Sequence, residues 1–135
     1  MTSHQFLDHT SETVLQVRAD DLPALYAEAV RALGELERAG LAGTGEPVER
    51  RLVLESPDPA GLLVDLLNEL IWLCETERLA PRSALVRMLG PAALEATVQG
   101  ERLTATPSFV KAATRHALKF ECGPSGCLAE VTLDV

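Results

Sequence analysis

Residues 62–74 constrain the fold most, because their hydrophobic side chains repeat at the spacing of an α-helix. A helix of 3.6 residues per turn brings these side chains onto one face and places Asp65, Asn68 and Glu69 on the opposite face. The segment is too short and too often interrupted by polar residues to reach the roughly 18 apolar residues of a membrane span, so no membrane crossing is predicted. The hydrophobic positions are Leu63, Leu66, Leu67, Leu70, Ile71 and Cys74.

A second helix is predicted over residues 22–37. Asp20 and Asp21 are residue types that cap helix N-termini, and Pro23 suits a first helical turn, where the N–H that it lacks has no helical partner. Apolar residues then recur at helical spacing at Leu22, Leu25, Ala29, Leu33 and Leu36. Three glycines and a proline indicate that a loop follows over 40–47.

The remaining segments are short and have the pattern of β-strands. Apolar and polar residues alternate over 14–19, and Gly-Pro, Gly-Glu and Gly-Pro-Ser-Gly turn signals separate the later segments. The predicted strands are residues 5–9, 14–19, 48–54, 84–89, 92–99, 109–114, 117–122 and 128–135. A length of 135 residues suits a single core. We therefore predict an α+β fold for one compact two-layer domain, residues 1–135. In it two helices pack on one face of a largely antiparallel sheet, and a sheet that also contains parallel strands is the alternative.

The charge balance narrows the function classes. The chain has 12 Lys and Arg against 20 Asp and Glu, which gives a formal net charge of −8 at pH 7. The lysines, Lys111 and Lys119, and the arginines are scattered and form no basic stripe, so direct binding of nucleic acid is not predicted. Tyr26 and Trp72 fall at helical positions, where packing explains them better than base stacking does.

The three cysteines, Cys74, Cys122 and Cys127, are too few and odd in number for a disulfide framework. The N-terminus lacks the basic and apolar regions of a secretory signal, which predicts a cytoplasmic protein. A reducing compartment predicts that all three cysteines are thiols with structural or incidental roles. Cys122 and Cys127 can face each other across a hairpin, but no second cysteine pair is present to complete a four-ligand zinc site.

The standard catalytic motifs are absent: no Gly-rich phosphate loop, no His-Glu-x-x-His and no Gly-x-Ser-x-Gly. One unusual feature is the end of the chain, where Asp134 is followed by the terminal carboxylate of Val135. Two neighbouring negative charges repel each other unless solvent or a cation screens them. Oxygen donors of this kind suit Ca²⁺, Mg²⁺ or Mn²⁺. A frayed, solvated chain end explains the same residues without a metal and, from these residues alone, is the favoured interpretation.

The other polar candidates also have structural explanations. Turn chemistry, in which Thr10 and Ser11 satisfy backbone groups, explains Glu12 without a ligand role. His9 suits a general base or a ligand, but a histidine at a strand end is more often a hydrogen-bonded structural group. Lys111 and His116 are five residues apart and lie on opposite faces of an unbroken strand, so we do not expect them to form a catalytic pair. Lys111 is expected to be solvated or ion-paired.

Four segments together resemble the archease family, small proteins that assist the RtcB-type tRNA-splicing RNA ligase. Residues 6–12 (FLDHTSE) resemble the family motif Phe-x-x-His-Thr-Ala-Asp. Residues 63–73 (LVDLLNELIWL) and 110–118 (VKAATRHAL) are similar to Leu-x-x-Trp-Leu-Asn-Glu-Leu-Ile-Tyr-Leu and Val-Lys-Ala-Val-Thr-Tyr-His-Gly-Leu. Residues 131–135 (VTLDV) match the family's terminal Val-x-Val-Asp-Val/Ile. The four segments follow one another in the family's order and span nearly the whole chain.

The resemblance implies a divalent metal site. In the family the ion is held by the acid of the first motif, by the penultimate acid and by the last residue, which correspond here to Glu12, Asp134 and Val135. His9 and Thr10 are then expected to support the motif loop through hydrogen bonds, as residues next to metal ligands commonly do. The resemblance therefore reverses the expectation of a merely frayed chain end. Lys111 and His116 remain motif residues to which no role is assigned.

The resemblance also implies a function: a protein cofactor without catalytic residues of its own, which promotes guanylylation and repeated turnover of an RtcB-type RNA ligase in tRNA splicing or RNA repair. The ligase would be the partner, and it would bind the RNA. The competing interpretation is an acidic, chaperone-like interaction module with no metal role. A small hydrolase that uses His9 or His116 as a base ranks last, because no nucleophile lies at motif spacing.

Two departures from the family pattern bear on this expectation. The motif acid is Glu12 instead of Asp, and a Glu carboxylate reaches one methylene further, so affinity or metal preference is expected to differ. The hairpin from Cys122 to Cys127 replaces the family's charged and aromatic run, so the family's partner contacts in that region do not carry over to this chain.

Overall fold

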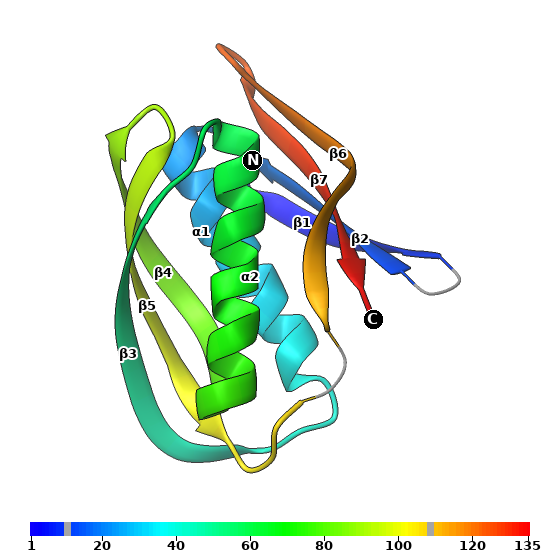
Figure 1. The fold of residues 1–135 in the computed structure, drawn as a ribbon, viewed down its shortest axis with the longest axis vertical. Coiled ribbons are helices and arrows are strands. Elements are labelled where there is room, and N and C mark those ends of the chain that lie inside the picture. The colour runs from blue at the N-terminus through cyan, green and yellow to red at the C-terminus, as the bar shows by residue number, and fades with distance from the viewer. Residues whose placement is uncertain (10–11, 108–109) are drawn as a thin grey trace.

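A computed structural model describes residues 1–9, 12–107 and 110–135 of the chain (Figure 1). The described elements are seven β-strands and two α-helices. In chain order they are β1 (Ser3–His9), β2 (Glu12–Ala19), α1 (Leu22–Arg38), β3 (Gly43–Glu55), α2 (Pro59–Glu77), β4 (Leu79–Gly90), β5 (Ala93–Leu103), β6 (Ala112–Gly123) and β7 (Gly126–Asp134).

The predicted α+β fold is confirmed, and every described strand pair is antiparallel. The strands divide into two sheets, one of four strands in the order β1-β2-β7-β6 and one of three in the order β3-β5-β4. Figure 1 shows both helices between the two sheets. The strand patterns carried no signal for this division, because each sheet buries one face and exposes the other and so produces the same alternation.

Both helices begin at an aspartate that caps the helix N-terminus. Asp21 accepts a hydrogen bond from the Ala24 backbone N–H at 2.9 Å at the start of α1, as predicted. Asp58 accepts one from the Gly61 N–H at 2.6 Å, so α2 starts three residues earlier than the hydrophobic pattern alone indicates. Among the described helices, none is both long and apolar enough to cross a membrane.

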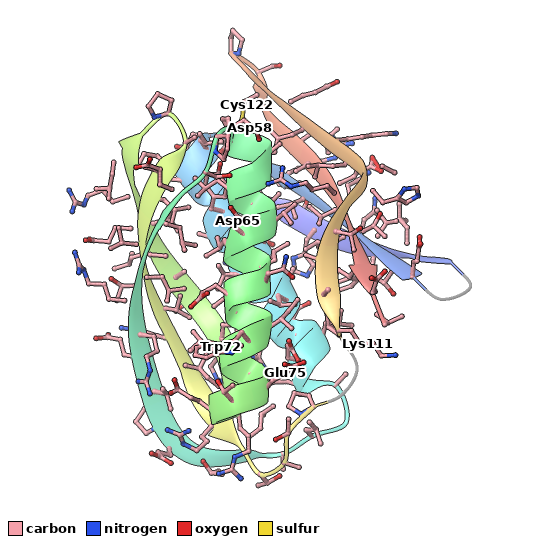
Figure 2. The ribbon with its side chains drawn as sticks, viewed as in Figure 1. Asp58, Asp65, Trp72, Glu75, Lys111 and Cys122 are labelled. Atoms are coloured by element: carbon pink, nitrogen blue, oxygen red, sulfur yellow. A yellow bond between two sulfur atoms is a disulfide. The ribbon has the colours of Figure 1, made fainter. Side chains whose placement is uncertain are left out.

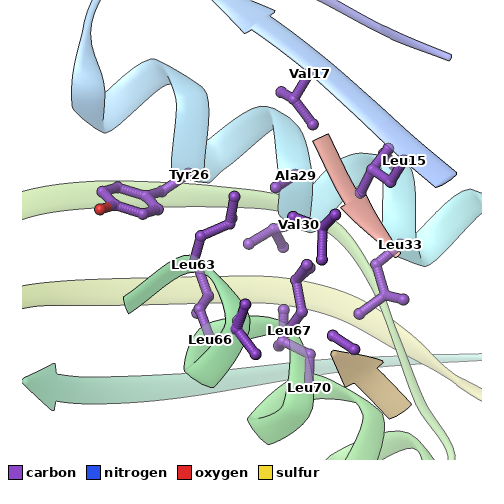
Figure 3. Close-up of a cluster of buried hydrophobic side chains, with 14 of the residues drawn as sticks. Leu15, Val17, Tyr26, Ala29, Val30, Leu33, Leu63, Leu66, Leu67 and Leu70 are labelled. Carbon is purple, nitrogen blue, oxygen red and sulfur yellow. The ribbon is translucent and has the colours of Figure 1, made fainter. Parts of the chain in front are cut away.

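The core joins both helices to both sheets (Figure 3). Its fully buried side chains include Leu15 of β2, Leu33 of α1 and Leu66 of α2. Tyr26 is also fully buried, and its hydroxyl donates a hydrogen bond to the Pro59 carbonyl at 2.8 Å, which ties α1 to the start of α2. The predicted packing role is thus confirmed for Tyr26. It is wrong for Trp72, which is 54% exposed.

Several strand predictions differ from the structure, and β4 begins at Leu79 where the predicted strand began at residue 84. β3 begins at Gly43, inside the predicted loop, because pairing with β5 extends beyond a register shift near Pro47. Residues 112–114 and 117–122 of the two predicted late strands belong to the single strand β6, whose pairing with β7 is interrupted between Thr114 and Lys119, while residue 109 lies outside the described residues. Within this interruption Ala117 has a φ of 53°, in the left-handed region.

The prediction that all cysteines are free thiols is wrong for one pair. Cys122 and Cys127 lie directly opposite each other where β6 and β7 approach their connecting turn, and they form a disulfide. The expectation of three thiols came from a reducing cellular compartment and from the number of cysteines. Neither of these indicates which residues face each other across two strands. Cys74 is a free thiol and is buried on α2, in agreement with a structural role.

Candidate metal centre

The first predicted metal ligand lies next to the second. Glu12 is the first residue of β2 and Asp134 the last of β7, and the two are direct partners in the antiparallel register. Both side chains lie on the outer face of the four-stranded sheet, because the following Thr13 and the preceding Leu133 are buried on the inner face. Directly opposite residues place their Cβ atoms about 4.5–5.5 Å apart. Tertiary pairing thus brings together two carboxylates from opposite ends of the chain.

The backbone around Asp134 is held by its neighbours. The Lys111 N–H donates a hydrogen bond to the Asp134 carbonyl at 2.8 Å, just before β6 begins. Val135, the third predicted ligand, follows Asp134 directly and lies beside the same strand end. The side chain of Lys111 is exposed, as predicted, and Figure 2 shows it pointing away from the helices.

His116 lies in the interrupted part of β6, where its backbone contacts β7 near this strand end. The Thr132 hydroxyl, on a side chain that is 3% exposed, donates a hydrogen bond to the His116 carbonyl at 3.1 Å. The His116 N–H donates in turn to the Thr114 hydroxyl at 3.3 Å. The strand is therefore interrupted between Lys111 and His116, so the two side chains need not lie on opposite faces. Thr132, which the sequence did not single out, fixes this bend.

The first motif is described only in part. The backbone of His9, the last residue of β1, pairs with Glu12 across the β1–β2 hairpin. Thr10 and the side chain of His9 lie outside the described part of the structure, so their predicted supporting roles remain predictions.

Similarity to known proteins now places the chain in a family. The model of the archease protein family matches residues 4–135. This chain belongs to the archease family. The proteins named archease from Methanosarcina mazei and Methanosarcina barkeri are 26% and 27% identical to it, and each alignment covers 98% of this chain and 95% of the relative. The resemblance that the four sequence segments indicated is confirmed.

Solved structures agree with this family fold. Protein 1598 of Methanobacterium thermoautotrophicum superimposes with a TM-score of 0.69 at 24% identity and covers 98% of both chains. A Thermotoga maritima archease, described as a "possible chaperone", has a TM-score of 0.68 at 24% identity and covers 96% of this chain and 94% of its own. At this identity the two structures support the fold and say nothing about function.

The donor set of this archease chain fits a hard cation. Glu12, Asp134 and the Val135 terminus offer carboxylate oxygens, the donors that Ca²⁺, Mg²⁺ and Mn²⁺ prefer. Within the described residues, no three His, Cys, Asp or Glu side chains come together as a metal cluster. A third protein ligand would therefore be the chain terminus, and bound water would complete the coordination.

A buried acid lies near this strand end and was not anticipated from the sequence. Glu37, in the last turn of α1, is 3% exposed, and its Oε1 atom has no hydrogen-bond partner in the described structure. Burial raises the pKa of Glu37 to about 7, against the opposing effect of its hydrogen bond with Cys74. Together with Lys111 and Val135, Glu37 lines a pocket of about 410 Å³.

Proposed function

We propose that this archease-family protein is a metal-binding protein cofactor of an RtcB-type RNA ligase, and that it promotes guanylylation and multiple turnover of that ligase in tRNA splicing or RNA repair. The observation that carries the proposal is the direct register pairing of Glu12 with Asp134 at the strand end next to the chain terminus. The family's role, and not the fold, supplies the partner.

The residues of this chain would act by holding charge at this strand end. Glu12, Asp134 and the Val135 carboxylate would hold a divalent ion. The Lys111 N–H would keep the Asp134 backbone in place through its 2.8 Å hydrogen bond. When bound, a divalent ion supplies positive charge that orients and neutralises nucleotide phosphates during nucleotidyl transfer. The acidic surface, with a net charge of −8, would leave RNA binding to the ligase.

Replacing Asp134 with alanine tests the metal role. Asp134→Ala should abolish multiple-turnover stimulation in an assay with limiting ligase and excess RNA, because the site loses one of its two side-chain carboxylates. Glu130→Gln is the matched control. Glu130 lies on the same outer face of β7, four residues away, and its substitution removes the same charge. Full stimulation by Asp134→Ala would contradict the proposal.

Thermal melting separates the metal role from the competing interaction-module role. A ligand that binds only the native state stabilises it by about 2.7 kcal/mol at one hundred times its Kd, so Ca²⁺ or Mn²⁺ should raise the Tm of the wild type and of Glu130→Gln but not of Asp134→Ala. If stimulation of the ligase persists and no ion shifts the Tm, the protein acts as an interaction module without a metal.

A further inference from the structure

The outward side of α2 carries features that the proposed metal site does not use. Figure 2 shows Asp65, Trp72 and Glu75 following one another along the side of α2 that no strand covers in this view. The spacings of seven and three residues place them on one helical face, and Glu69 falls on the same face. We call these four residues the acidic-aromatic face. The opposite face of α2 is buried, with Leu66 and Leu70 fully enclosed.

Trp72 is the only tryptophan of the chain, and its side chain is 54% exposed. Its backbone carbonyl accepts a hydrogen bond from Thr76, but the ring contacts in the described structure involve other residues, His4 with Phe6 and Tyr26 with Phe120. A large aromatic side chain left on the surface is a typical anchor of a protein interface. Its surroundings show what kind of partner it would anchor.

The carboxylates of the acidic-aromatic face have no compensating cation. Within the described residues, Asp65, Glu69 and Glu75 form no ion pair, although Glu77 at the helix end pairs with Arg50. On the outer face of the three-stranded sheet, by contrast, two glutamates are paired with arginines. Arg51 and Arg87 both pair with Glu95, and Arg82 pairs with Glu101. Unpaired negative charge therefore lies beside Trp72.

We propose that the acidic-aromatic face of α2 docks a basic protein segment, with an arginine or lysine side chain over the Trp72 ring and further cations facing the carboxylates. A cation above an indole ring is attracted by its π-electrons, and neighbouring carboxylates strengthen that attraction. A second copy of this chain would bring the same carboxylates together, and nucleic acid would bring phosphates, so both are disfavoured. The proposal rests on α2 alone and does not depend on the metal site.

A fluorescein-labelled, amidated peptide of eight arginines is a suitable probe for the wild-type protein. We expect saturable binding by fluorescence anisotropy at low salt, and a change in Trp72 emission with the same midpoint. An eight-lysine peptide should bind several-fold more weakly, because guanidinium stacks on aromatic rings better than ammonium does. The absence of saturable binding by the arginine peptide would overturn the proposal.

Variants locate the binding on this face. Trp72→Ala should weaken peptide binding about tenfold, and Trp72→Tyr should retain most of it, because an aromatic ring remains. The double variant Glu69→Gln, Glu75→Gln should also weaken it about tenfold. Glu55→Gln, Glu121→Gln is the matched control, since both acids are exposed and the change in net charge is the same. Equal weakening by the control pair, or an unchanged affinity in Trp72→Ala, would overturn the proposal.

A measurement without variants guards against loss of folding. Backbone amide chemical shifts of the wild type, titrated with the arginine peptide, should change over α2 near Trp72 and not on the outer face of the three-stranded sheet. Shifts centred on that sheet instead would contradict the assignment to α2.

Discussion

Ala117 is the residue of β6 whose backbone conformation is least suited to its side chain. Its φ of 53° lies in the left-handed region, where a Cβ atom approaches the neighbouring carbonyl oxygen. The archease motif that this strand resembles has glycine at the corresponding place. The hydrogen bond from Thr132 to the His116 carbonyl holds the bend although that glycine is absent. The bend is thus kept here at an energetic cost.

Replacing Ala117 with glycine should therefore stabilise the protein. We expect Ala117→Gly to raise the free energy of unfolding by about 0.5–1 kcal/mol, because glycine adopts a positive φ without the Cβ clash. Urea denaturation measures the change. Ala112→Gly, in the regularly paired part of β6, should instead lower the free energy of unfolding by a similar amount. Destabilisation by Ala117→Gly would contradict this account of the bend.

Single residues also mark where sequence inference succeeded and where it stopped. The four motif segments identified the family and named Glu12 and Asp134, although local patterns had placed Glu12 in a turn. Trp72 and Leu66 both lie on the same helix, but only the surrounding elements decide that Leu66 is enclosed and Trp72 is not. Helical spacing identifies the side of a helix and leaves open how far its neighbours cover it.

At the scale of elements, the contact between α1 and β4 is the tightest constraint. An added Cβ atom at Gly34 would lie only 1.8 Å from the Pro81 carbonyl oxygen. The Arg38 guanidinium donates a hydrogen bond to the same carbonyl at 2.5 Å, one helical turn further on. Gly34 thus allows α1 to lie against the backbone of β4, and Arg38 supplies the carbonyl with a partner.

Substitution at this contact should be costly. We expect Gly34→Ala to lower the free energy of unfolding by about 3 kcal/mol, because the clash is with backbone and α1 would have to move away from β4. Gly123→Ala is the control, since an added Cβ there meets no atom within 4 Å. Calorimetric melting of both variants tests the comparison. A Gly34→Ala protein as stable as the control would show that α1 tolerates the displacement.

The stability of the whole molecule should depend on pH in an unusual direction. The His4 ring lies between α1 and β1, with Nδ1 2.6 Å from Glu28 Oε2 and Nε2 2.7 Å from Glu35 Oε2. Burial alone would lower the pKa of His4, but the hydrogen bonds to both carboxylates outweigh it and raise the pKa. Burial likewise raises the pKa of Glu37 to about 7.

These two groups have the same effect on folding. The stabilisation from protonated His4 is fully present below about pH 6.5, the pKa of an unperturbed histidine, and is lost as the pH rises through its raised folded pKa. The buried Glu37 carboxyl does not destabilise the fold below its unfolded pKa of about 4.5, where it is protonated. Above about pH 7 it is charged, and the destabilisation reaches its full size. At both groups the folded protein binds more protons than the unfolded chain, so rising pH weakens the fold.

We therefore expect the free energy of unfolding to fall by about 2 kcal/mol between pH 5 and pH 8, as measured by urea denaturation at each pH. Glu37→Gln should remove much of this fall and be more stable than the wild type at pH 8, because the amide carries no charge to bury. His4→Gln should flatten the remaining slope above pH 6.5. A wild-type stability that rises across this range would contradict both assignments.

The sequence by itself determined the local features of this protein: two amphipathic helices, one-sided strands, an acidic surface and the motif segments of the archease family. These features depend on residues close together in the chain. In the helices and strands the spacing of the apolar residues indicates which face is apolar. The tertiary structure decided which faces meet. It divided the strands into two sheets, paired Glu12 with Asp134, joined Cys122 to Cys127, buried Glu37 and left Trp72 exposed. Such contacts join distant segments and depend on strand register and packing, which periodicity does not encode.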